Sequence, residues 1–261
     1  MRVAVLGLGE AGRLYVEGFS SLGVDVVGYD PQSPEPLLTG LRVGTVADAV
    51  RNADFVVSLT GAEASRAVLD AALPAISAST VYADLNTARP EHKAGLAQQA
   101  ANHATAFADV AVMAPVPRAG VLTPLLASGT GAERVAAEWS VLGIPIRDVG
   151  EVAGHAAGLK LLRSVFMKGL AALVYEGVTA ASHLGERDWM TAEIASELGP
   201  EGAALVDRLL DGTRLHARRR AHEMHDVISY LGDLNAPHWM SDATVQWLEA
   251  LAEDPGFADS P

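Results

Sequence analysis

The first half of the chain alternates short apolar runs with segments of helical periodicity. The runs are four to seven residues long and comprise Val3–Leu6, Val24–Tyr29, Phe55–Leu59, Val81–Leu85, Ala106–Val112, Leu125–Ser128 and Pro145–Val149. Buried strands of a parallel sheet form such continuous apolar runs, and the helices between them cover both faces of the sheet. The pattern therefore predicts an α/β fold, a doubly wound parallel sheet, over residues 1–152.

From Gly154 onward the strand pattern disappears. A helix-period segment runs from about His155 to Leu184, which is long enough to connect two domains. The remaining helical segments are Trp189–Leu198, Gly202–Asp211, Thr213–Leu231 and Ser241–Ala252. We therefore expect residues 153–261 to form a separate, all-α C-terminal domain.

A glycine-rich turn follows the first apolar run directly. Its sequence is Gly7-Leu8-Gly9-Glu10-Ala11-Gly12. Gly7 permits a tight turn, Gly9 lets the backbone approach a pyrophosphate, and Gly12 lets the next helix pack closely on the strand. The free N–H groups and the positive dipole end of that helix would hold the phosphates of a dinucleotide. The alternative is a tight turn in some other doubly wound sheet, because glycine-rich turns are common.

Asp30 ends the second apolar run, 18 residues after Gly12. In Rossmann-type domains an acid roughly 20 residues after the last glycine hydrogen-bonds the adenosine ribose. Because a carboxylate repels a 2′-phosphate, Asp30 favours NAD as the cofactor, and NADP stays open as an alternative. Thr60, Gly61 and Asn86 follow later strands, so we expect them to border the same cofactor crevice.

Composition and charge narrow the range of partners. The chain has 261 residues, a net charge of −13 and a pI near 4.9, which argues against nucleic acid or an anionic membrane surface as a partner. No apolar run reaches the roughly 20 residues of a membrane span, and a strand begins close to Met1, so a cytoplasmic protein is expected. Cysteine is absent, and His222 and His225 lack the HExxH arrangement, so no metal site is expected.

Lys160 is the candidate proton-transfer group. It lies one turn into the predicted long helix, in an apolar stretch where partial desolvation would disfavour a charged ammonium. Hydride transfer to a carbonyl leaves an alkoxide that needs a proton, so a redox enzyme requires such a group. Ser164 and Lys168 extend the same helix face at four-residue intervals. The alternative is a surface lysine whose stem packs on apolar side chains.

Four segments match the motifs of one enzyme family. The motifs GLGxMG, DxST, DAPVSGG and GxGxxxKxxxN correspond here to Gly7–Gly12, Asp84–Thr87, Asp109–Pro115 and Gly154–Ser164. In these motifs, and over nearly its whole length, the chain resembles the β-hydroxyacid dehydrogenases, which include 3-hydroxyisobutyrate dehydrogenase and 6-phosphogluconate dehydrogenase, and especially their short phosphogluconate-dehydrogenase-like relatives. The resemblance implies an NAD(P)-dependent dehydrogenase that works as a homodimer, with Lys160 as the catalytic lysine. It also implies that the loop Met113-Ala114-Pro115 binds a small-molecule substrate.

The chain departs from the family at the residues that recognise substrate. Met113 replaces a substrate-binding serine, two loop residues are missing, and Ser164 replaces an asparagine that orients the substrate. Arg219 lies 13 residues before Gly232, in the place of a family lysine that faces cofactor or substrate. The departures imply a different or less polar substrate head, while Lys168 and Arg219 can still hold a carboxylate or phosphate.

Three functions are therefore open from the sequence. The first is hydride transfer between nicotinamide and a small hydroxyacid, oxo-acid or related carbonyl compound, with Lys160 as general acid/base and Ser164 orienting the substrate. The second is imine reduction on the same scaffold. The third is a dinucleotide-binding regulatory protein without turnover.

Overall fold

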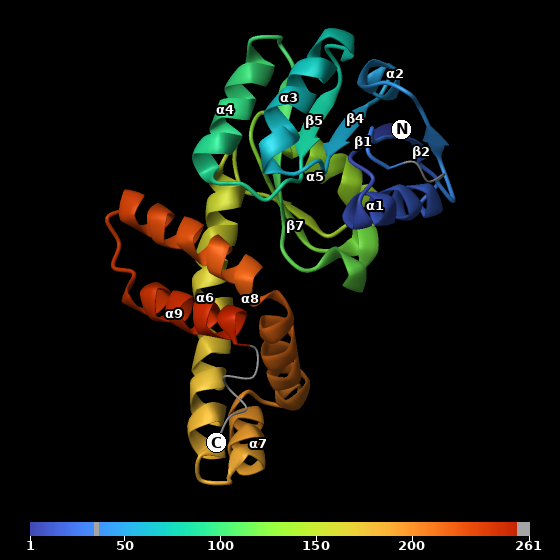
Figure 1. The fold of residues 1–261 in the computed structure, drawn as a ribbon. Helices are drawn as coiled ribbons and strands as arrows, with labels where there is room; N and C mark the ends of the chain where they lie inside the picture. Colours follow the sequence, from blue (N-terminus) through green and yellow to red (C-terminus); the bar gives the residue numbers. More distant parts are fainter. Residues whose placement is uncertain (34–36, 255–261) are drawn as a thin grey trace. The chain divides into compact units, whose positions relative to one another are not determined.

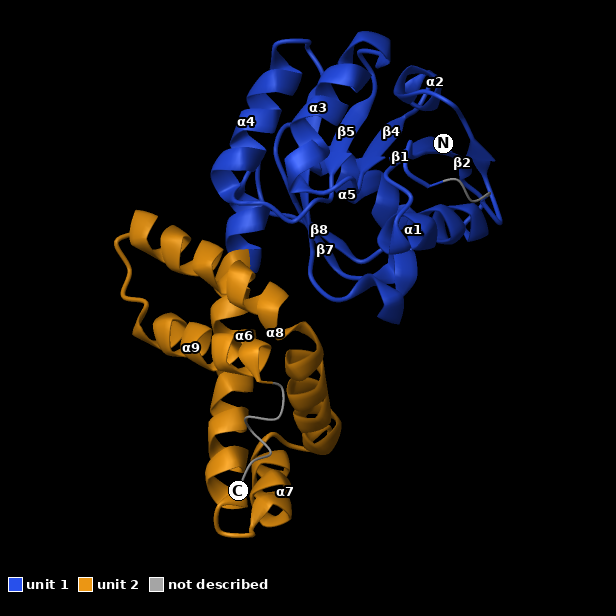
Figure 2. Ribbon diagram, in the orientation of Figure 1, with its two compact units in different colours: residues 1–160 blue, residues 161–261 orange. Residues whose placement is uncertain are grey.

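The computed structural model describes residues 1–33 and 37–254 and contains two compact units, residues 1–160 and 161–261 (Figure 2). Strands and helices alternate in the first unit, as the apolar pattern predicts (Figure 1). Its strands are β1 (Arg2–Leu6), β2 (Asp25–Tyr29), β3 (Leu41–Arg42), β4 (Phe55–Ser58), β5 (Val81–Asp84), β6 (Ala106–Val112), β7 (Leu125–Ser128) and β8 (Ile146–Asp148). Its helices are α1 (Glu10–Ser21), α2 (Val46–Val50), α3 (Ala62–Ala72), α4 (Pro90–Ala101) and α5 (Ala132–Val141), with short 3-10 turns η1 (Leu73–Ala75), η2 (Val116–Arg118) and η3 (Gly120–Leu122).

The strands form one sheet in the order β3-β2-β1-β4-β5-β6-β7-β8. The predicted parallel arrangement is confirmed from β3 to β6. β7 instead runs antiparallel to β6, and β8 is parallel to β7. The cause is the connection 113–124, which contains two 3-10 turns and no crossover helix, and a parallel pair needs a long crossover. The strand order reverses between β1 and β4, which is the switch point where doubly wound sheets bind ligands.

Alternate residues of each strand enter different cores, because successive side chains of a strand point to opposite faces. Val3 and Val5 pack with α1 and α5. In the same core, the rings of Phe19 and Phe55 meet the Trp139 ring edge-on, with ring centroids 5.3 and 5.8 Å apart. Ala4 and Leu6 pack on the other face, against α2, α3 and α4. Helices therefore cover both faces of the sheet, and its strand ends are left to form a site.

Two elements of this unit escaped the sequence analysis, β3 and α2. Each is short, at two and five residues, so neither produces a readable hydrophobic period. Thr45 caps α2 by accepting a hydrogen bond from the Asp48 N–H at 3.1 Å. β3 pairs with β2 and brings Arg42 beside the end of that strand.

The second unit is helical, as predicted. α6 (His155–Ser182) begins in the first unit and continues into the second, which also holds α7 (Arg187–Glu197), α8 (Gly202–Asp233) and α9 (Trp239–Glu253). The predicted separation of two helices at Gly212 was wrong. α8 runs through Gly212 and is interrupted at His216, whose φ of −122° and ψ of 20° are not helical.

Candidate active site

The glycine turn has the geometry that its spacing predicts. Gly7 has φ +92°, and an added Cβ would lie 2.6 Å from the Leu59 carbonyl oxygen. A Cβ on Gly12 would lie 1.9 Å from the Gly7 carbonyl oxygen, so the protein itself requires both glycines. A Cβ on Gly9, by contrast, would meet nothing within 4 Å. The open space at Gly9 fits the cofactor's pyrophosphate, which would take the first-turn N–H groups of α1, where no side chain acts as a cap.

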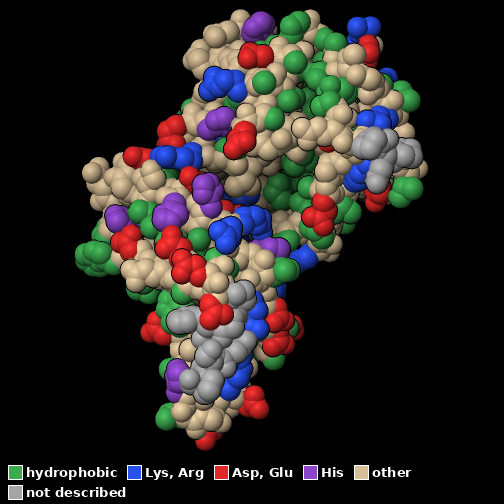
Figure 3. Space-filling view, viewed as in Figure 1, with side chains coloured by type: hydrophobic (Ala, Val, Ile, Leu, Met, Phe, Trp, Pro, Cys, Tyr) green, Lys and Arg blue, Asp and Glu red, His purple; other side chains and the backbone are tan. Residues whose placement is uncertain are grey.

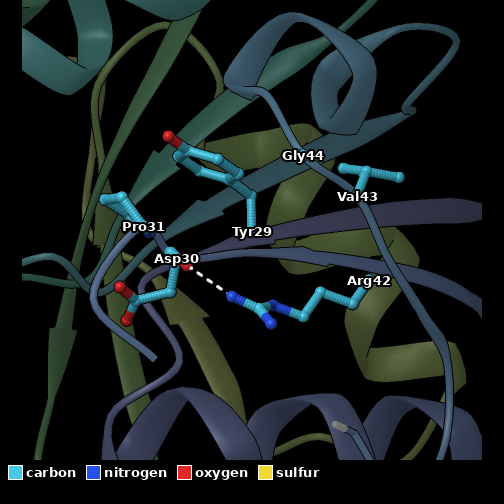
Figure 4. A pocket seen from close by; sticks show the side chains of 6 residues that line it. All are labelled: Tyr29, Asp30, Pro31, Arg42, Val43 and Gly44. Atoms are coloured by element: carbon cyan, nitrogen blue, oxygen red, sulfur yellow. Dashed lines mark hydrogen bonds between the residues drawn. The ribbon is translucent and has the colours of Figure 1, made fainter. Parts of the chain in front are cut away.

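Asp30 lies beside this turn, where its carboxylate accepts the Leu8 and Gln32 N–H groups at 2.8 Å each. Arg42 donates from Nη2 to the Asp30 main-chain oxygen at 3.0 Å, as Figure 4 shows. A cavity of about 540 Å³ is lined by Tyr29, Asp30, Pro31, Arg42, Val43 and Gly44. Its position at the end of β2 fits the adenosine half of a dinucleotide. Arg42 is a lining residue that the sequence analysis missed, because β3 was not recognised.

The turns after β4 and β5 are connected through Asn86. Its Oδ1 accepts the Gly61 N–H at 2.7 Å, and its Nδ2 donates to Ser58 Oγ at 3.0 Å and to Asp84 Oδ1. Thr60 Oγ1 lies 3.5 Å from Ser58 Oγ. Asn86 is only 6% exposed, and both amide hydrogens are used within the protein. The side chain predicted to contact the cofactor thus fixes the loop that carries Gly61.

Lys160 lies at the carboxyl edge of the same sheet. Its Nζ donates to Thr87 Oγ1 at 2.9 Å, and Thr87 lies three residues after the end of β5. The side chain of Lys160 is half-buried. The structure thus joins the two motifs that the sequence analysis connected only by resemblance, the turn after β5 and the lysine of the long helix.

The predicted substrate loop leaves the same edge after β6. The Met113 N–H donates to the Pro124 carbonyl at 2.9 Å, which closes the loop. Met113 and Ala114 are half-buried and Pro115 is exposed. Further along, a Cβ on Gly18 of α1 would lie 2.5 Å from Val121, so the loop packs closely on that helix.

Ser164, Lys168 and Arg219 belong to a cluster in the second unit. Lys168 Nζ donates to Ser164 Oγ at 3.0 Å and pairs with Glu223 Oε2 at 2.8 Å. Arg219 pairs with Glu223 Oε1 at 3.4 Å. Burial lowers the pKa of Lys168, Glu223 opposes that shift, and the charges of Arg220 and Arg219 add to it. Glu223, which gave no signal in the sequence, already pairs with both cations.

A buried ion cluster in the first unit also escaped the sequence analysis. Lys93 of α4 is 1% exposed, and its Nζ lies 2.8 Å from Asp84 Oδ2 and 3.2 Å from Asp109 Oδ1. Burial lowers the pKa of Lys93, but the charges and hydrogen bonds of Asp84 and Asp109 outweigh burial and raise it overall. The acid inside the apolar run Ala106–Val112 was the available signal, since a buried carboxylate needs a partner.

Charged side chains of both signs also occur on the surface of the helical unit. On the face drawn in Figure 3, acidic, basic and histidine side chains lie among one another over the helical unit. Within residues 1–33 and 37–254, no group of three or more His, Asp or Glu side chains is arranged to hold a metal ion. Among the described helices, none combines the length and the apolar character that a membrane crossing needs.

Comparison with known proteins places this geometry in context. A family profile described as the NAD binding domain of 6-phosphogluconate dehydrogenase matches residues 2–138. A second, described as a domain of unknown function (DUF1932), matches residues 181–251. A conserved hypothetical protein of Sinorhizobium meliloti is 29% identical, with a TM-score of 0.78 over 96% of this chain and 88% of the other.

Two solved structures with named activities share the fold. The 3-hydroxyisobutyrate dehydrogenase of Mycobacterium tuberculosis has a TM-score of 0.81 at 18% identity and covers 97% of this chain and 94% of its own. The imine reductase of Myxococcus stipitatus in complex with NADP⁺ has a TM-score of 0.65 at 21% identity and covers 97% and 95%. A variant of that enzyme was solved with NAD⁺. At these identities the likeness shows the fold alone.

Proposed function

The chain belongs to the β-hydroxyacid dehydrogenase family, with the NAD binding domain of 6-phosphogluconate dehydrogenase, and on that premise we propose that it catalyses hydride transfer between nicotinamide and a small hydroxyacid, oxo-acid or related carbonyl compound. We assign cofactor binding to residues 1–152, and substrate binding and dimerisation to residues 153–261. The observation that carries the proposal is the hydrogen bond from Lys160 to Thr87 at the carboxyl edge of the sheet.

The order of the strands explains why the position of Lys160 suits proton transfer next to a nicotinamide ring. The adenosine cavity lies on the β2 and β3 side of the glycine turn, so the nicotinamide half extends across β4 toward β5. Thr87 follows β5, two strands from β1, which is roughly 10 Å at about 4.8 Å per strand. Lys160 is therefore on the side of the sheet edge where a nicotinamide ring would lie.

The residues then act as follows. The glycine turn and Asp30 would hold NAD(P)H, which would supply the hydride for the carbonyl carbon of the substrate. Lys160, held by Thr87, donates a proton from Nζ to the carbonyl oxygen, and in the reverse direction its neutral amine accepts the hydroxyl proton. Ser164 and the loop Met113-Ala114-Pro115 orient the substrate. A carboxylate or phosphate on the substrate would compete with Glu223 for Lys168 and Arg219.

NAD is the preferred cofactor in this proposal, because the Asp30 carboxylate lies at the adenosine cavity and repels a 2′-phosphate. Arg42, which lines the same cavity, is the residue through which NADP would also bind. Calorimetry with NADH and NADPH compares the two directly. A Gly9→Ala variant is expected to lose about 10- to 100-fold in affinity, the range of one charge-assisted hydrogen bond.

Gly232→Ala provides the matched control for that variant, since its added Cβ also meets nothing within 4 Å. It should bind NADH as the wild type does. Equal affinity of the Gly9→Ala and wild-type proteins would contradict the assignment of the pyrophosphate to this turn.

The reaction class is tested by NADH and NADPH oxidation with a panel of oxo-acids, aldehydes and imines. Turnover of oxo-acids or aldehydes supports the proposal. Turnover confined to imines would replace it with imine reduction, and tight cofactor binding without any turnover would indicate a regulatory protein.

The homodimer remains a proposal as well. Apolar side chains of the helical unit are exposed, including Phe166, Leu173, Trp239 and Met240 at 60% or more. A helical domain of this size gains burial by pairing with a second copy. Light scattering coupled to size-exclusion chromatography measures the mass directly, and a monomer at micromolar concentration would contradict this part.

A further inference from the structure

The buried Lys93 lies in α4 and pairs with Asp84 and Asp109, neither of which is assigned to cofactor or substrate binding. Its Nζ donates hydrogen bonds to the Asp84 main-chain oxygen and to Asp84 Oδ2, each at 2.8 Å, and forms an ion pair with Asp109 Oδ1 at 3.2 Å. Asp84 and Asp109 are directly paired across β5 and β6. Without the ammonium, two carboxylates would face each other in a buried position, so Lys93 offsets the repulsion between them.

Asp109 in turn holds the beginning of α6. Its Oδ2 accepts the Gly154 N–H at 3.2 Å, the Ala157 N–H at 3.0 Å and the Ser128 hydroxyl at 3.3 Å. Ser128 Oγ accepts the Ala156 N–H at 3.0 Å. These first-turn N–H groups have no partner within the helix, so the buried carboxylate and hydroxyl act as a cap supplied by the sheet.

The packing of α6 on α4 supports the same fixed position. Gly154 has φ +95°, and a Cβ on it would lie 2.6 Å from the Pro90 carbonyl oxygen. α4 begins at Pro90, so the helix that carries Lys93 and the helix that carries Lys160 meet at their first residues. Lys160 lies three residues after Ala157, within reach of the turn that Asp109 holds.

Asp84 fixes the other side of the Lys160 contact. Lys93 binds its main-chain oxygen at the end of β5, and Asn86 donates to its Oδ1. Thr87, the acceptor of the Lys160 hydrogen bond, follows in the same turn. One buried ammonium therefore connects to both partners of that hydrogen bond, through Asp84 on one side and Asp109 on the other.

We propose that Lys93 is a positioning residue that sets the place of the Lys160 amine by holding the end of β5 and the first turn of α6 together. This inference rests on the proposed function, in which Lys160 moves the proton, and it adds a role for a residue that never meets the substrate. Lys93 differs from an apolar core residue because the end of β5 and the first turn of α6 both depend on its single charge.

The chain contains only three lysines, Lys93, Lys160 and Lys168, which allows a direct measurement. Protein labelled with ¹³C and ¹⁵N in lysine gives three side-chain signals in NMR spectra, and single Lys→Met variants assign them. In the wild type we expect the two ε-protons of Lys160 to have different shifts, because the side chain is held. In Lys93→Met they should become equivalent as the side chain gains freedom.

Kinetics provide the second readout. Lys93→Met should lower kcat per folded molecule by about 10- to 100-fold, the scale on which small misplacements of a reacting group act, and leave KM for NADH near the wild-type value. Leu96→Ala is the matched control. Leu96 lies three residues later in α4 and is fully buried in the apolar cluster, so its variant is destabilised without losing the ion cluster. Its Lys160 signal and its kcat per folded molecule should stay unchanged.

A second pair of variants covers the case in which Lys93→Met does not fold. Ser128→Ala removes only the hydroxyl between Asp109 and α6, and Thr80→Ala removes a buried hydroxyl just before the other end of β5. Ser128→Ala should shift the Lys160 ε-protons toward equivalence, and Thr80→Ala should not.

The proposal is overturned if Lys93→Met gives the same Lys160 signals as the wild type. If Lys93→Met does not fold, unchanged Lys160 signals in Ser128→Ala overturn it. It is equally overturned if Leu96→Ala or Thr80→Ala changes them as much. Failure of the proposed function looks different. Lys160→Met would then keep full turnover, whatever the spectra show about how Lys160 is held.

Discussion

The two lysine–carboxylate clusters of this protein differ in burial and in charge balance. In the first unit, Lys93 and its partners Asp84 and Asp109 are at most 1% exposed at their side chains. In the second, Lys168 is 12% exposed, Glu223 29% and Arg219 67%. The first cluster has two acids to one base, whereas in the second Glu223 pairs with two bases and a third base, Arg220, adds its charge.

This difference separates a structural ion cluster from one that can exchange partners. The pKa of Lys93 is raised because two carboxylates outweigh burial, whereas the pKa of Lys168 is lowered because burial and two arginines outweigh Glu223. Water cannot replace a lost partner in the first cluster, but it can in the second. The ammonium of Lys93 is therefore fixed among its partners, whereas in the proposed function Lys168 would exchange Glu223 for a substrate anion.

The largest expected effect comes from removing the buried cation. Lys93→Met should lose about 3–5 kcal/mol of unfolding free energy at neutral pH, since it leaves two buried carboxylates without a cation. The repulsion between these facing acids should weaken on acidification, so the loss should be smaller at low pH than at pH 7. Urea denaturation at several pH values measures both. A loss below about 1 kcal/mol, typical of an exposed pair, would abolish the contrast between the clusters.

An intermediate effect is expected from restoring the charge balance. The double variant Lys93→Met/Asp84→Asn has one buried carboxylate, so its net buried charge equals that of the wild-type cluster. We expect it to recover roughly half of the stability lost in Lys93→Met, a coupling typical of groups in one network. The same denaturation series measures the difference. Exact additivity of the two single variants would mean that charge is not what the cluster balances.

A small effect is expected in the second unit. Lys168→Met should change the unfolding free energy by no more than about 1 kcal/mol, because Glu223 keeps Arg219 and is partly solvated. Denaturation at pH 7 measures this change, with Arg51→Met, which removes an exposed i,i+3 pair with Asp48, as the comparison. A loss as large as that of Lys93→Met would show that Lys168 is structural.

The smallest effect is a difference in pH dependence. The folded pKa of Lys168 lies below that of the unfolded chain, so wild-type stability relative to Lys168→Met should rise as pH increases toward about 10.4. Lys93 has the opposite sign, because its raised pKa keeps its contribution constant over this range and loses it only at higher pH. Denaturation between pH 7 and 10 distinguishes the two, and parallel curves for both variants would contradict the assigned directions.

The fold and part of the site could be predicted from sequence because they rest on local patterns. Glycine spacing located the Gly7–Gly12 turn, and apolar runs located most strands. The antiparallel direction of β7 could not be predicted so simply, since it depends on a connector that lacks a crossover helix. The interruption of α8 at His216 instead of Gly212 was equally inaccessible, because both residues lie in one amphipathic pattern.

Long-range contacts account for the remaining gaps. The hydrogen bond of Asn86 to Gly61, the pairing of Glu223 with Lys168 and the pairing of Lys93 with Asp109 join residues that lie 25, 55 and 16 positions apart in the sequence. Periodicity reports only which face of an element is apolar. It therefore located Lys160 on its helix but not the acids, several elements away, that hold that helix in place.

The central claim is that Lys160 moves the proton, and its most direct test is the kcat of Lys160→Met with the substrate that the panel identifies. We predict a loss of about 10²- to 10⁴-fold, the range of general acid–base catalysis, with NADH affinity by calorimetry equal to that of the wild type. A kcat within about twofold of the wild type, far below that range, would contradict the account.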